Sequence, residues 1–420
     1  METKYTIKKI LSREIFDSRG NPTIETIITT ANGVSAHSSV PSGASTGSHE
    51  AIELRDGGNR FSGLGIFGAI KNINEIIAPI IIGKDVRSQN EIDQIMLKLD
   101  GTENKSRLGA NAILSVSLAV ARLAAKIEEK ELYEYLNSIS NLNKSIAMPK
   151  LYVNLINGGK HTKSKLAFQE YMAVFENSEQ DEIFENIFKV QKELREQISG
   201  GLGDEGGFIM NTENIEAPLL ILKNTLIKLD LQDKVKLAMD VAASSFYKDN
   251  KYLLQEKEID SKELLEVYKN LVNTYDILSI EDPFEENNFI SFSNITKELK
   301  DTLIIGDDLT VTNKNLLAKA IENKSITGII IKPNQIGTLT EVFETVKLAQ
   351  ENNIKCIVSH RSGETNDDFI ADLAVSIGAY GIKLGAMQRG ERIAKYNRLK
   401  EINSNLQNSL KHNFLKGFRG

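Results

Sequence analysis

The sequence contains a single cysteine, Cys356, and this scarcity rules out a disulfide framework. The residue lies within the apolar run KCIVSH, so we expect a buried structural thiol and not a nucleophile. A chain without disulfides fits a reducing compartment. We therefore predict a cytoplasmic location, and nothing in these residues bears on a secondary exposure at the cell surface.

Excess positive charge and long apolar runs are also absent. The net charge is -6 and the isoelectric point is near 5.7, which leaves no basic surface for nucleic acid. The longest uncharged helical stretch, Leu108 to Ala121, is shorter than the roughly 18 residues that a membrane span requires. It predicts a buried helix. The charged start METKYTIKKIL lacks an apolar signal region, so we expect neither a secretory signal nor a membrane span.

The length of 420 residues favours two domains, or one barrel-sized domain with an addition. Residues 8–40 alternate in polarity between the turn signals SRGNP and ANG, which predicts an antiparallel strand meander. Helical periodicity follows to residue 138. We therefore expect a smaller α+β capping domain over 1–138, a polar linker over 139–149 and a second domain over 150–420.

The second domain repeats one pattern, in which a short apolar run ends in a polar residue. The residues at these ends are Asp240, Glu281, Asp307, Lys332, His360 and Lys383. Amphipathic stretches separate the runs, and from Glu281 onward the interval is about 25 residues, the length of one strand and one crossover helix. We predict an α/β fold with a C-terminal barrel of serial βα units, whose strand ends face one shared mouth.

Three of these strand ends are acidic: Asp240, Glu281 and Asp307. Three carboxylates around one mouth repel one another unless a cation neutralises them. The set is all oxygen, without clustered cysteines or paired histidines, so it favours Mg²⁺ over zinc. The alternative for each acid is that it caps the following helix, a role that fits Asp282 and Asp308 better.

Lys332 follows three isoleucines and precedes Pro333, so it is held at the end of a buried strand. A lysine at such a position commonly extends to solvent. Beside a bound dication its pKa would instead fall toward the range of roughly 7 to 8 in which a neutral amine serves as a base. A metal-bound carboxylate next to such a base suits proton abstraction from the adjacent carbon.

Removal of that proton leaves a group to be expelled, which requires an acid on the opposite face. The sequence offers two candidate sources of this acid. The loop GGLGDEGGF, Gly200 to Phe208, presents Asp204 and Glu205 between glycines, although a solvated turn is the alternative. Glu170 is a charge inside the apolar segment LAFQEYMAVF. Arg361, Ser362 and Lys383 offer anion binding. The small residues of PSGASTGSHE, 41–50, predict a closing lid.

The chain resembles the enolase family along its whole length. The motifs that support the resemblance are DSRGNPT, PSGASTG, GDEGGF, SIEDPF, DDLTVTN, NQIGTLTE, SHRSGET and AKYNRL. The resemblance implies a small α+β domain, a (β/α)8 barrel of TIM type with a modified start, and a homo-oligomer, either a dimer or an octamer. It also implies a Mg²⁺-dependent hydro-lyase of glycolysis that interconverts 2-phospho-D-glycerate and phosphoenolpyruvate.

The resemblance also implies individual roles. Asp240, Glu281 and Asp307 match ligands of a first Mg²⁺, and Ser45 matches the ligand of a second Mg²⁺ that arrives with substrate. Lys332 matches the base that takes the C2 proton, Glu205 the acid that protonates the departing C3 hydroxyl, and Glu170 the acid that assists it. The residues that match substrate contacts are His161, Gln169, Glu170, His360, Arg361, Ser362 and Lys383.

Some positions depart from the family pattern and leave alternatives open. Thr-Lys-Ser-Lys follows His161, Ile209 and Met210 follow the GDEGGF loop, and Leu384 follows Lys383. One alternative is a paralogue acting on a related phosphonate or acid-sugar carboxylate. The other is a binding role as a surface receptor or assembly scaffold.

Overall fold

The computed structural model describes residues 3–43, 47–162, 164–176 and 180–417. The chain begins with an antiparallel sheet of β1 (Ile7–Phe16), β2 (Pro22–Thr30) and β3 (Ser35–Ser39). The predicted meander is thus present. The turn between the first two strands is closed by a hydrogen bond from Asp17 N to Asn21 O, after which Pro22 begins β2.

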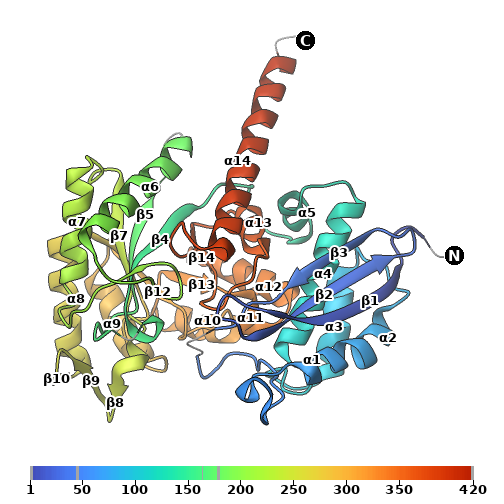
Figure 1. Ribbon diagram of the computed structural model, residues 1–420, viewed down its shortest axis with the longest axis horizontal. Coiled ribbons are helices and arrows are strands. Elements are labelled where there is room, and N and C mark those ends of the chain that lie inside the picture. The colour runs from blue at the N-terminus through green and yellow to red at the C-terminus, as the bar shows by residue number, and fades with distance from the viewer. Residues whose placement is uncertain (1–2, 44–46, 163, 177–179, 418–420) are drawn as a thin grey trace.

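Helices follow the sheet and cover one of its faces (Figure 1). They are the 3₁₀ turn η1 (Arg60–Gly63), α1 (Phe67–Lys71), the π-turn η2 (Asn72–Ile77), α2 (Ala78–Ile81), α3 (Gln89–Asp100), α4 (Ala110–Ile127) and α5 (Leu132–Ile139). Of the described helices, α4 alone has the length and apolarity of a membrane span. It is 89% buried inside the protein, against β2, β3, α3 and α5, because nearly every residue in it is apolar or small. It is the core helix of this region.

The rest of the chain forms a closed barrel of eight strands. In order around the ring, they are β4 (Lys150–Asn157), β5 (Glu170–Phe175), β7 (Val235–Asp240), β11 (Ile277–Glu281), β12 (Leu303–Gly306), β13 (Gly328–Ile331), β14 (Lys355–Ser359) and β15 (Gly381–Lys383). The pairing of β15 with β4 closes the ring. The two-residue strand β6 (Phe208–Ile209) adds to β4 from outside the ring. The predicted barrel is confirmed.

The start of the barrel is modified, as expected. β5 pairs antiparallel with both β4 and β7, whereas the other neighbours in the ring run parallel. The first residue of an antiparallel strand lies at the same edge as the last residues of its parallel neighbours. Glu170, the first residue of β5, therefore lies beside Asp240, the last residue of β7. The charge inside an apolar segment is in fact a residue of the barrel mouth.

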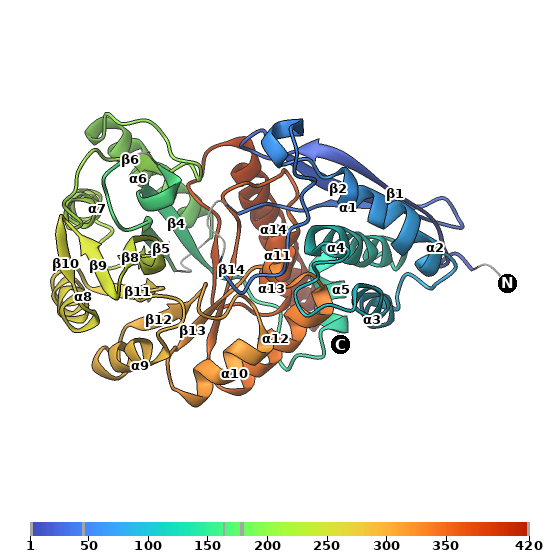
Figure 2. The same cartoon turned by 90° about the horizontal axis from the view of Figure 1, so that it is seen from below.

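Helices surround the barrel on its outside (Figure 2). They are α6 (Gln180–Gln197), α7 (Ala217–Lys228), α8 (Ser261–Tyr275), α9 (Phe289–Glu298), α10 (Lys314–Glu322), the short α11 (Pro333–Ile336), α12 (Leu339–Glu351), α13 (Phe369–Ser376) and α14 (Gly390–Gly417). Short turns η3 (Gly159–His161) and η4 (Ala243–Phe246) follow β4 and β7, and a small sheet of β8 (Tyr247–Lys248), β9 (Lys251–Leu254) and β10 (Lys257–Ile259) precedes α8. The helices shield the strands from solvent, so their apolar runs can be continuous.

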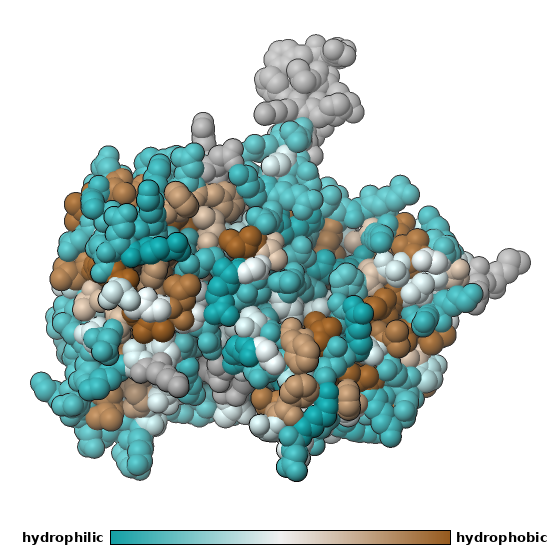
Figure 3. Space-filling view, viewed as in Figure 1, coloured by the Kyte–Doolittle hydropathy of each residue, from teal (hydrophilic) through white to brown (hydrophobic). Residues whose placement is uncertain are grey.

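The inside of the barrel has its own core, formed by Tyr152, Met172, Val174, Ala238, Ile305, Ile330 and Ile357. This packing fills the interior below the mouth, so the barrel is not a pore. Cys356 is buried in the outer core, which confirms the predicted buried thiol. On the face in Figure 3, hydrophobic side chains form separate small patches among hydrophilic ones.

The N-terminal region and the barrel are joined by buried polar contacts. The carboxylate of Asp93 on α3 accepts hydrogen bonds from the backbone N–H of Thr340, 3.0 Å, and from its hydroxyl, 2.6 Å. Asp93 is completely buried, and its carboxylate provides a hydrogen-bond acceptor for a backbone N–H group in the first turn of α12. The contact holds the N-terminal region against the barrel.

Candidate active site

The structure brings the predicted strand-end residues together around the carboxyl edge of the barrel. Glu170, Asp240 and Glu281 stand side by side on β5, β7 and β11, where Glu170 pairs with Asp240 and Asp240 with Glu281. Asp307 follows β12 and Lys332 follows β13. All three candidate metal ligands are nearly inaccessible to solvent. Such a row of buried carboxylates requires nearby positive charge.

Lys383, the last residue of β15, supplies that charge to two of the three acids. Its ammonium nitrogen lies 2.7 Å from Glu281 Oε2 and 3.2 Å from Asp240 Oδ2. Burial lowers the pKa of the Lys383 ammonium, but the carboxylates of Glu170, Glu281 and Asp240 together hold it well above its usual range. The side chain predicted to contact substrate is therefore a fixed cation at the centre of the acidic row.

Lys332 pairs with the third acid. Its Nζ lies 2.5 Å from Asp307 Oδ2. Burial lowers the pKa of Lys332, but the nearby carboxylates, Asp307 first and then Glu281, together outweigh burial, so the pKa lies above the usual lysine value. This direction is opposite to the expected fall, because that expectation placed a dication beside the lysine. A cation bound to Asp307 would compete for the same carboxylate and weaken the effect that raises the pKa.

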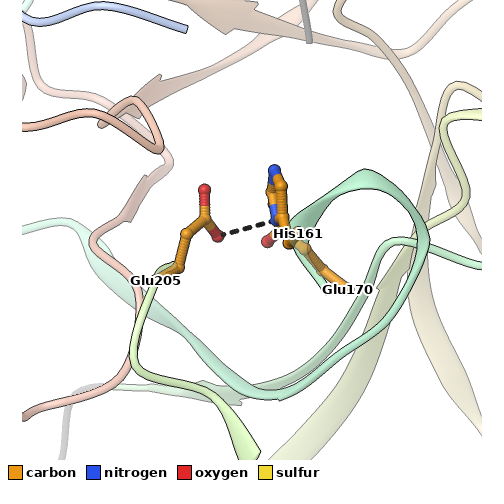
Figure 4. Close-up of side chains that lie close together, drawn as sticks. All are labelled: His161, Glu170 and Glu205. Atoms are coloured by element: carbon orange, nitrogen blue, oxygen red, sulfur yellow. Dashed lines mark ion pairs between the residues drawn. The ribbon is translucent and has the colours of Figure 1, made fainter. Parts of the chain in front are cut away.

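A second cluster shares Glu170 with this acidic row and consists of His161, Glu170 and Glu205 (Figure 4). Their side-chain ligand atoms all lie within 4.8 Å of one another, and His161 Nδ1 is 3.6 Å from Glu205 Oε2. The backbone of η3 presents His161, and the glycine-rich loop after α6 presents Glu205. Both predicted acids and one predicted substrate contact thus point toward one another.

The loop that carries Glu205 can adopt its position only because two glycines, Gly206 and Gly207, follow Glu205. A Cβ on Gly207 would lie 2.5 Å from Asn157 Oδ1, so only glycine lets this loop approach the end of β4 so closely. Gly206 has a φ of +82°, which other residues rarely adopt. The loop consequently turns the carboxylate of Glu205 inward, where Asn154 Nδ2 donates to Oε2 over 2.9 Å. The alternative of a solvated turn is excluded, because Glu205 is only 3% exposed.

The two acids of this cluster differ in protonation. Burial and the charge of Glu205 raise the pKa of the Glu170 carboxyl well above its usual range. Burial also acts to raise the pKa of Glu205, but the imidazoles of His161 and His360 hold it well below its usual range. Neighbouring carboxylates of this kind share a proton unequally. The cluster therefore keeps a proton on Glu170 while Glu205 is ionised.

The remaining predicted contacts line the same mouth. Gln169 Nε2 donates to Asp240 Oδ2 over 3.3 Å. Ser362 is buried in the segment that follows β14 in the chain. His360 lies with Nε2 3.5 Å from Glu205 Oε2. The guanidinium of Arg361 forms a forked pair with Glu50, with nitrogen–oxygen distances of 3.0 and 3.1 Å.

Glu50 belongs to the predicted lid, 41–50. Ser45, the predicted ligand of a second Mg²⁺, lies outside the described residues, as does Lys163 in the altered segment after His161. On the described side of the lid, Ser48 N donates to Glu286 Oε2 over 3.0 Å, and His49 Nε2 is 3.0 Å from Asn287 Oδ1. The lid thus contacts both the 282–287 loop and Arg361.

The donor set fits a hard, oxygen-seeking cation. Glu281 Oε1 and Gln169 Oε1 are buried and have no hydrogen-bond partner within the part of the chain that the structure describes. Asp240 and Glu281 already converge on one cationic group, the ammonium of Lys383. Unpartnered oxygens of this kind suit Mg²⁺.

Among the described residues, the predicted ligands Asp240, Glu281 and Asp307 do not form a group whose ligand atoms all lie within 4.8 Å of one another. Besides the cluster of His161, this spacing is met by Asp282, Asp307 and Asp308. However, the two carboxylate oxygens of Asp282 accept the backbone N–H groups of Asp307, 2.9 Å, and Asp308, 2.7 Å. Asp282 therefore fixes the turn that presents Asp307, which agrees with a supporting role. Burial and the adjacent Asp307 raise the pKa of Asp308 to about 8.

Four residues of the site were not identified from the sequence: Glu50, Thr312, Gln335 and Arg392. Arg392 is fully buried and donates to His360 Nδ1 over 2.8 Å, and to the carbonyl oxygens of Arg361 and Ser362. It lies within α14, where no pattern distinguishes it from a surface arginine. The other three could have been found, because Thr312 and Gln335 lie within the motifs DDLTVTN and NQIGTLTE, and Glu50 ends the segment PSGASTGSHE.

Comparison with known proteins agrees with this geometry. Residues 7–136 match the model of the enolase N-terminal domain, and residues 145–417 match that of the enolase C-terminal TIM barrel domain. The chain is 48% identical to an enolase of Methanocaldococcus jannaschii, with 97% of each chain covered. It is 45% identical to one of Methanococcus vannielii, again with 97% of each covered, and 44% identical to one of Campylobacter jejuni, with 94% of this chain and 96% of that one covered. The chain belongs to the enolase family.

Proposed function

We propose that the protein is a hydro-lyase that reversibly dehydrates 2-phospho-D-glycerate to phosphoenolpyruvate in glycolysis. The observation that supports this most directly is the placement of Lys332 and Glu170 around the barrel. Lys332 follows β13 and Glu170 begins β5, and three strands separate them in either direction around the ring. Base and acid therefore approach a substrate in the mouth from opposite sides.

This opposition suits an elimination in which two bonds break on opposite faces of the substrate. Lys332 Nζ accepts the proton from C2 after losing its own to solvent, and the electron pair of that C–H bond becomes available to form the C2–C3 double bond. The Glu170–Glu205 pair delivers a proton to the C3 hydroxyl, which leaves as water. In this proposal the proton rests on Glu170 before the reaction and reaches the C3 hydroxyl through Glu205, the carboxylate nearest the leaving group. Both carboxylates are ionised once water has left.

We propose that Asp240, Glu281 and Asp307 hold one Mg²⁺ and that Ser45 contributes to a second that binds with substrate. When bound, Mg²⁺ stabilises the negative charge that develops on the substrate carboxylate. Lys383 adds a fixed positive charge at the same place. The convergence of Asp240 and Glu281 on one ammonium group and the buried Glu281 Oε1, which has no hydrogen-bond partner among the described residues, support the assignment of these two ligands.

Arg361 is the proposed phosphate ligand, because its planar guanidinium matches two phosphate oxygens at once. Ser362, His360, His161 and Gln169 complete the proposed substrate contacts. We also propose a cytoplasmic homo-oligomer with a small phosphorylated substrate as its partner, and a division of the chain into 1–138, 139–149 and 150–420. The full-length similarity to enolases gives no support to the alternatives of another acid substrate or a scaffold role.

The proposal is tested by following the ultraviolet absorbance of the enol product with purified protein, substrate and Mg²⁺. We expect turnover that EDTA abolishes and that excess Mg²⁺ restores. Lys332→Ala should eliminate it, whereas Lys347→Ala, which changes an exposed lysine on α12, should not. Absence of EDTA-sensitive turnover in the unmodified protein would refute the proposed activity. The candidate paralogue substrates serve as the comparison, and faster turnover of one of them would favour that alternative.

A further inference from the structure

Gln335 lies at the centre of the candidate site without having a role in the proposed chemistry. It belongs to α11, three residues after Lys332, and is completely buried. Its Nε2 donates to Asp307 Oδ1 over 2.9 Å and approaches Glu50 Oε1 at 3.4 Å. Its Oε1 accepts from the hydroxyl of Thr312 over 2.8 Å. One amide therefore joins a proposed metal ligand, the lid and the turn after β12.

The direction of these hydrogen bonds is fixed by the partners. Ionised carboxylates only accept, so the amide must present its NH₂ group to Asp307 and its oxygen to Thr312. The Thr312 hydroxyl must then donate to Gln335, and its oxygen is left to accept the backbone N–H of Lys332, 2.9 Å away. The carbonyl of Ile330 is a more distant acceptor, at 3.4 Å. Four residues thus form a polarised series of hydrogen bonds.

The series closes on itself. It begins at the backbone of Lys332, passes through Thr312 and Gln335 to Asp307 Oδ1, and returns from Asp307 Oδ2 to the Nζ of Lys332. The main chain and the side chain of one lysine are therefore both tied to one carboxylate. A ring of this kind leaves Asp307 one orientation, in which Oδ2 faces the amine.

Thr312 occupies its place at a conformational cost. Its φ is +56°, and that of Val311 before it is +41°, which β-branched residues rarely adopt. The surrounding structure must hold such residues in place. Here Thr345 on α12 donates its hydroxyl to the Thr312 carbonyl over 2.8 Å. The strain coincides with the one residue whose hydroxyl links Lys332 to Gln335.

We infer that Thr312 and Gln335 are positioning residues that orient Asp307 and Lys332 relative to each other. This inference rests on the proposed function, in which Lys332 is the base and Asp307 a metal ligand. Partners that orient a ligating carboxylate typically change metal affinity or activity by about 10- to 100-fold when they are removed. Neither residue needs to touch substrate for this effect.

The sharpest test uses a matched pair at position 312. Thr312→Val keeps the shape and β-branching but removes the hydroxyl, whereas Thr312→Ser keeps the hydroxyl. We expect Thr312→Val to lower kcat by about 10- to 100-fold with little change in KM, and Thr312→Ser to restore most of the loss. Exchange of the substrate C2 hydrogen with solvent should slow in parallel, because the base is displaced. Thr225→Val, at a buried threonine on α7, is the control for loss of a buried hydroxyl.

A second variant gives a readout that does not depend on turnover. Gln335→Met fills a similar volume but cannot donate to Asp307. We expect calorimetric titration with Mg²⁺ to give a Kd about 10- to 100-fold higher than that of the unmodified protein. Circular dichroism and thermal unfolding show whether each variant is folded. If Thr312→Val does not fold, Gln335→Met and Thr312→Ser still test the inference.

The outcomes separate this inference from the proposed function. If the unmodified protein has no turnover, the proposed function is wrong. If it is active and the folded Thr312→Val and Gln335→Met proteins match it in kcat, C2 exchange and Mg²⁺ affinity, the positioning role is wrong. A loss of stability with unchanged kcat in the folded fraction would also overturn the inference, since it would assign these residues to folding alone.

Discussion

Arg392 donates a hydrogen bond from Nη1 to Nδ1 of His360 over 2.8 Å. An arginine side chain has donors and no acceptor, and it stays charged in proteins. Nδ1 of His360 must therefore carry a lone pair, and the proton of the neutral ring lies on Nε2, which faces Glu205. The buried guanidinium thus fixes both the tautomer and the neutrality of this histidine.

This arrangement predicts how the pH affects stability. Burial lowers the pKa of His360 from about 6.5 to about 4. The unfolded chain binds a proton below about 6.5 and the folded chain only below about 4, so the free energy of unfolding rises with pH across that window. The contribution is fully present above pH 6.5 and is lost as the pH falls toward 4. It amounts to about 3 kcal/mol.

Urea unfolding of the unmodified protein and of His360→Gln, measured between pH 4 and pH 7, tests this expectation. Gln can accept from Arg392 through its amide oxygen but does not titrate. The difference in unfolding free energy between the two proteins should change by about 3 kcal/mol across the window. A difference that stays constant with pH would contradict the account of His360.

A second prediction concerns Arg361. Arg361→Lys keeps the charge but loses the forked contact with Glu50 and the matching contact proposed for phosphate. Hydrogen bonds to charged groups contribute enough binding free energy that their loss in Arg361→Lys should raise KM roughly tenfold to hundredfold. The effect on kcat should be smaller. Steady-state kinetics gives both values, and the exposed Arg107→Lys is the control. An unchanged KM would exclude Arg361 as the phosphate ligand.

A third prediction concerns Cys356. Burial raises the pKa of its thiol to about 12, so almost no thiolate exists near neutral pH. Because the thiolate is the reactive form, we expect Ellman's reagent to label the native protein very slowly and the urea-unfolded protein at once. Equal labelling rates in the two states would show that the thiol is accessible in the native fold.

A fourth prediction separates the two halves of the proposed reaction. Glu205→Gln removes the carboxylate nearest the leaving group but leaves Lys332 and Asp307 unchanged. We expect kcat for dehydration to fall by about 10²- to 10⁴-fold, while exchange of the C2 hydrogen with solvent continues. The measurement is deuterium incorporation into recovered substrate. If exchange stops together with dehydration, Glu205 acts in proton abstraction and the assigned roles are wrong.

The sequence predicted the barrel because its strands are buried on both faces. Continuous apolar runs such as GIII before Lys332 occur where helices cover a parallel sheet, and their regular spacing identifies the connections. The polar residue after each run could also be assigned to one mouth, since parallel strands share a carboxyl edge. Glu170 could not be placed this way, because nothing in its own segment shows that β5 runs antiparallel.

Contacts between side chains were less predictable than their location. The spacing of Asp240, Glu281 and Lys383 does not reveal that the ammonium lies between the two carboxylates. The pKa of Lys332 is raised and not lowered as had been expected, because Lys332 pairs with Asp307. The sequence does not reveal this pair, since it depends on the orientation of the Asp307 side chain, to which Gln335 donates a hydrogen bond. Arg392 had no local signal at all, because its role depends on which loops α14 meets.

The central claim is that Lys332 removes the C2 proton, and the most direct measurement is exchange of that hydrogen with deuterated solvent, followed by nuclear magnetic resonance of the substrate. With Mg²⁺ present, the unmodified protein should exchange it, Glu205→Gln should continue to do so, and folded Lys332→Ala should show no exchange above the rate without protein. Exchange by Lys332→Ala at the rate of the unmodified protein would contradict the account.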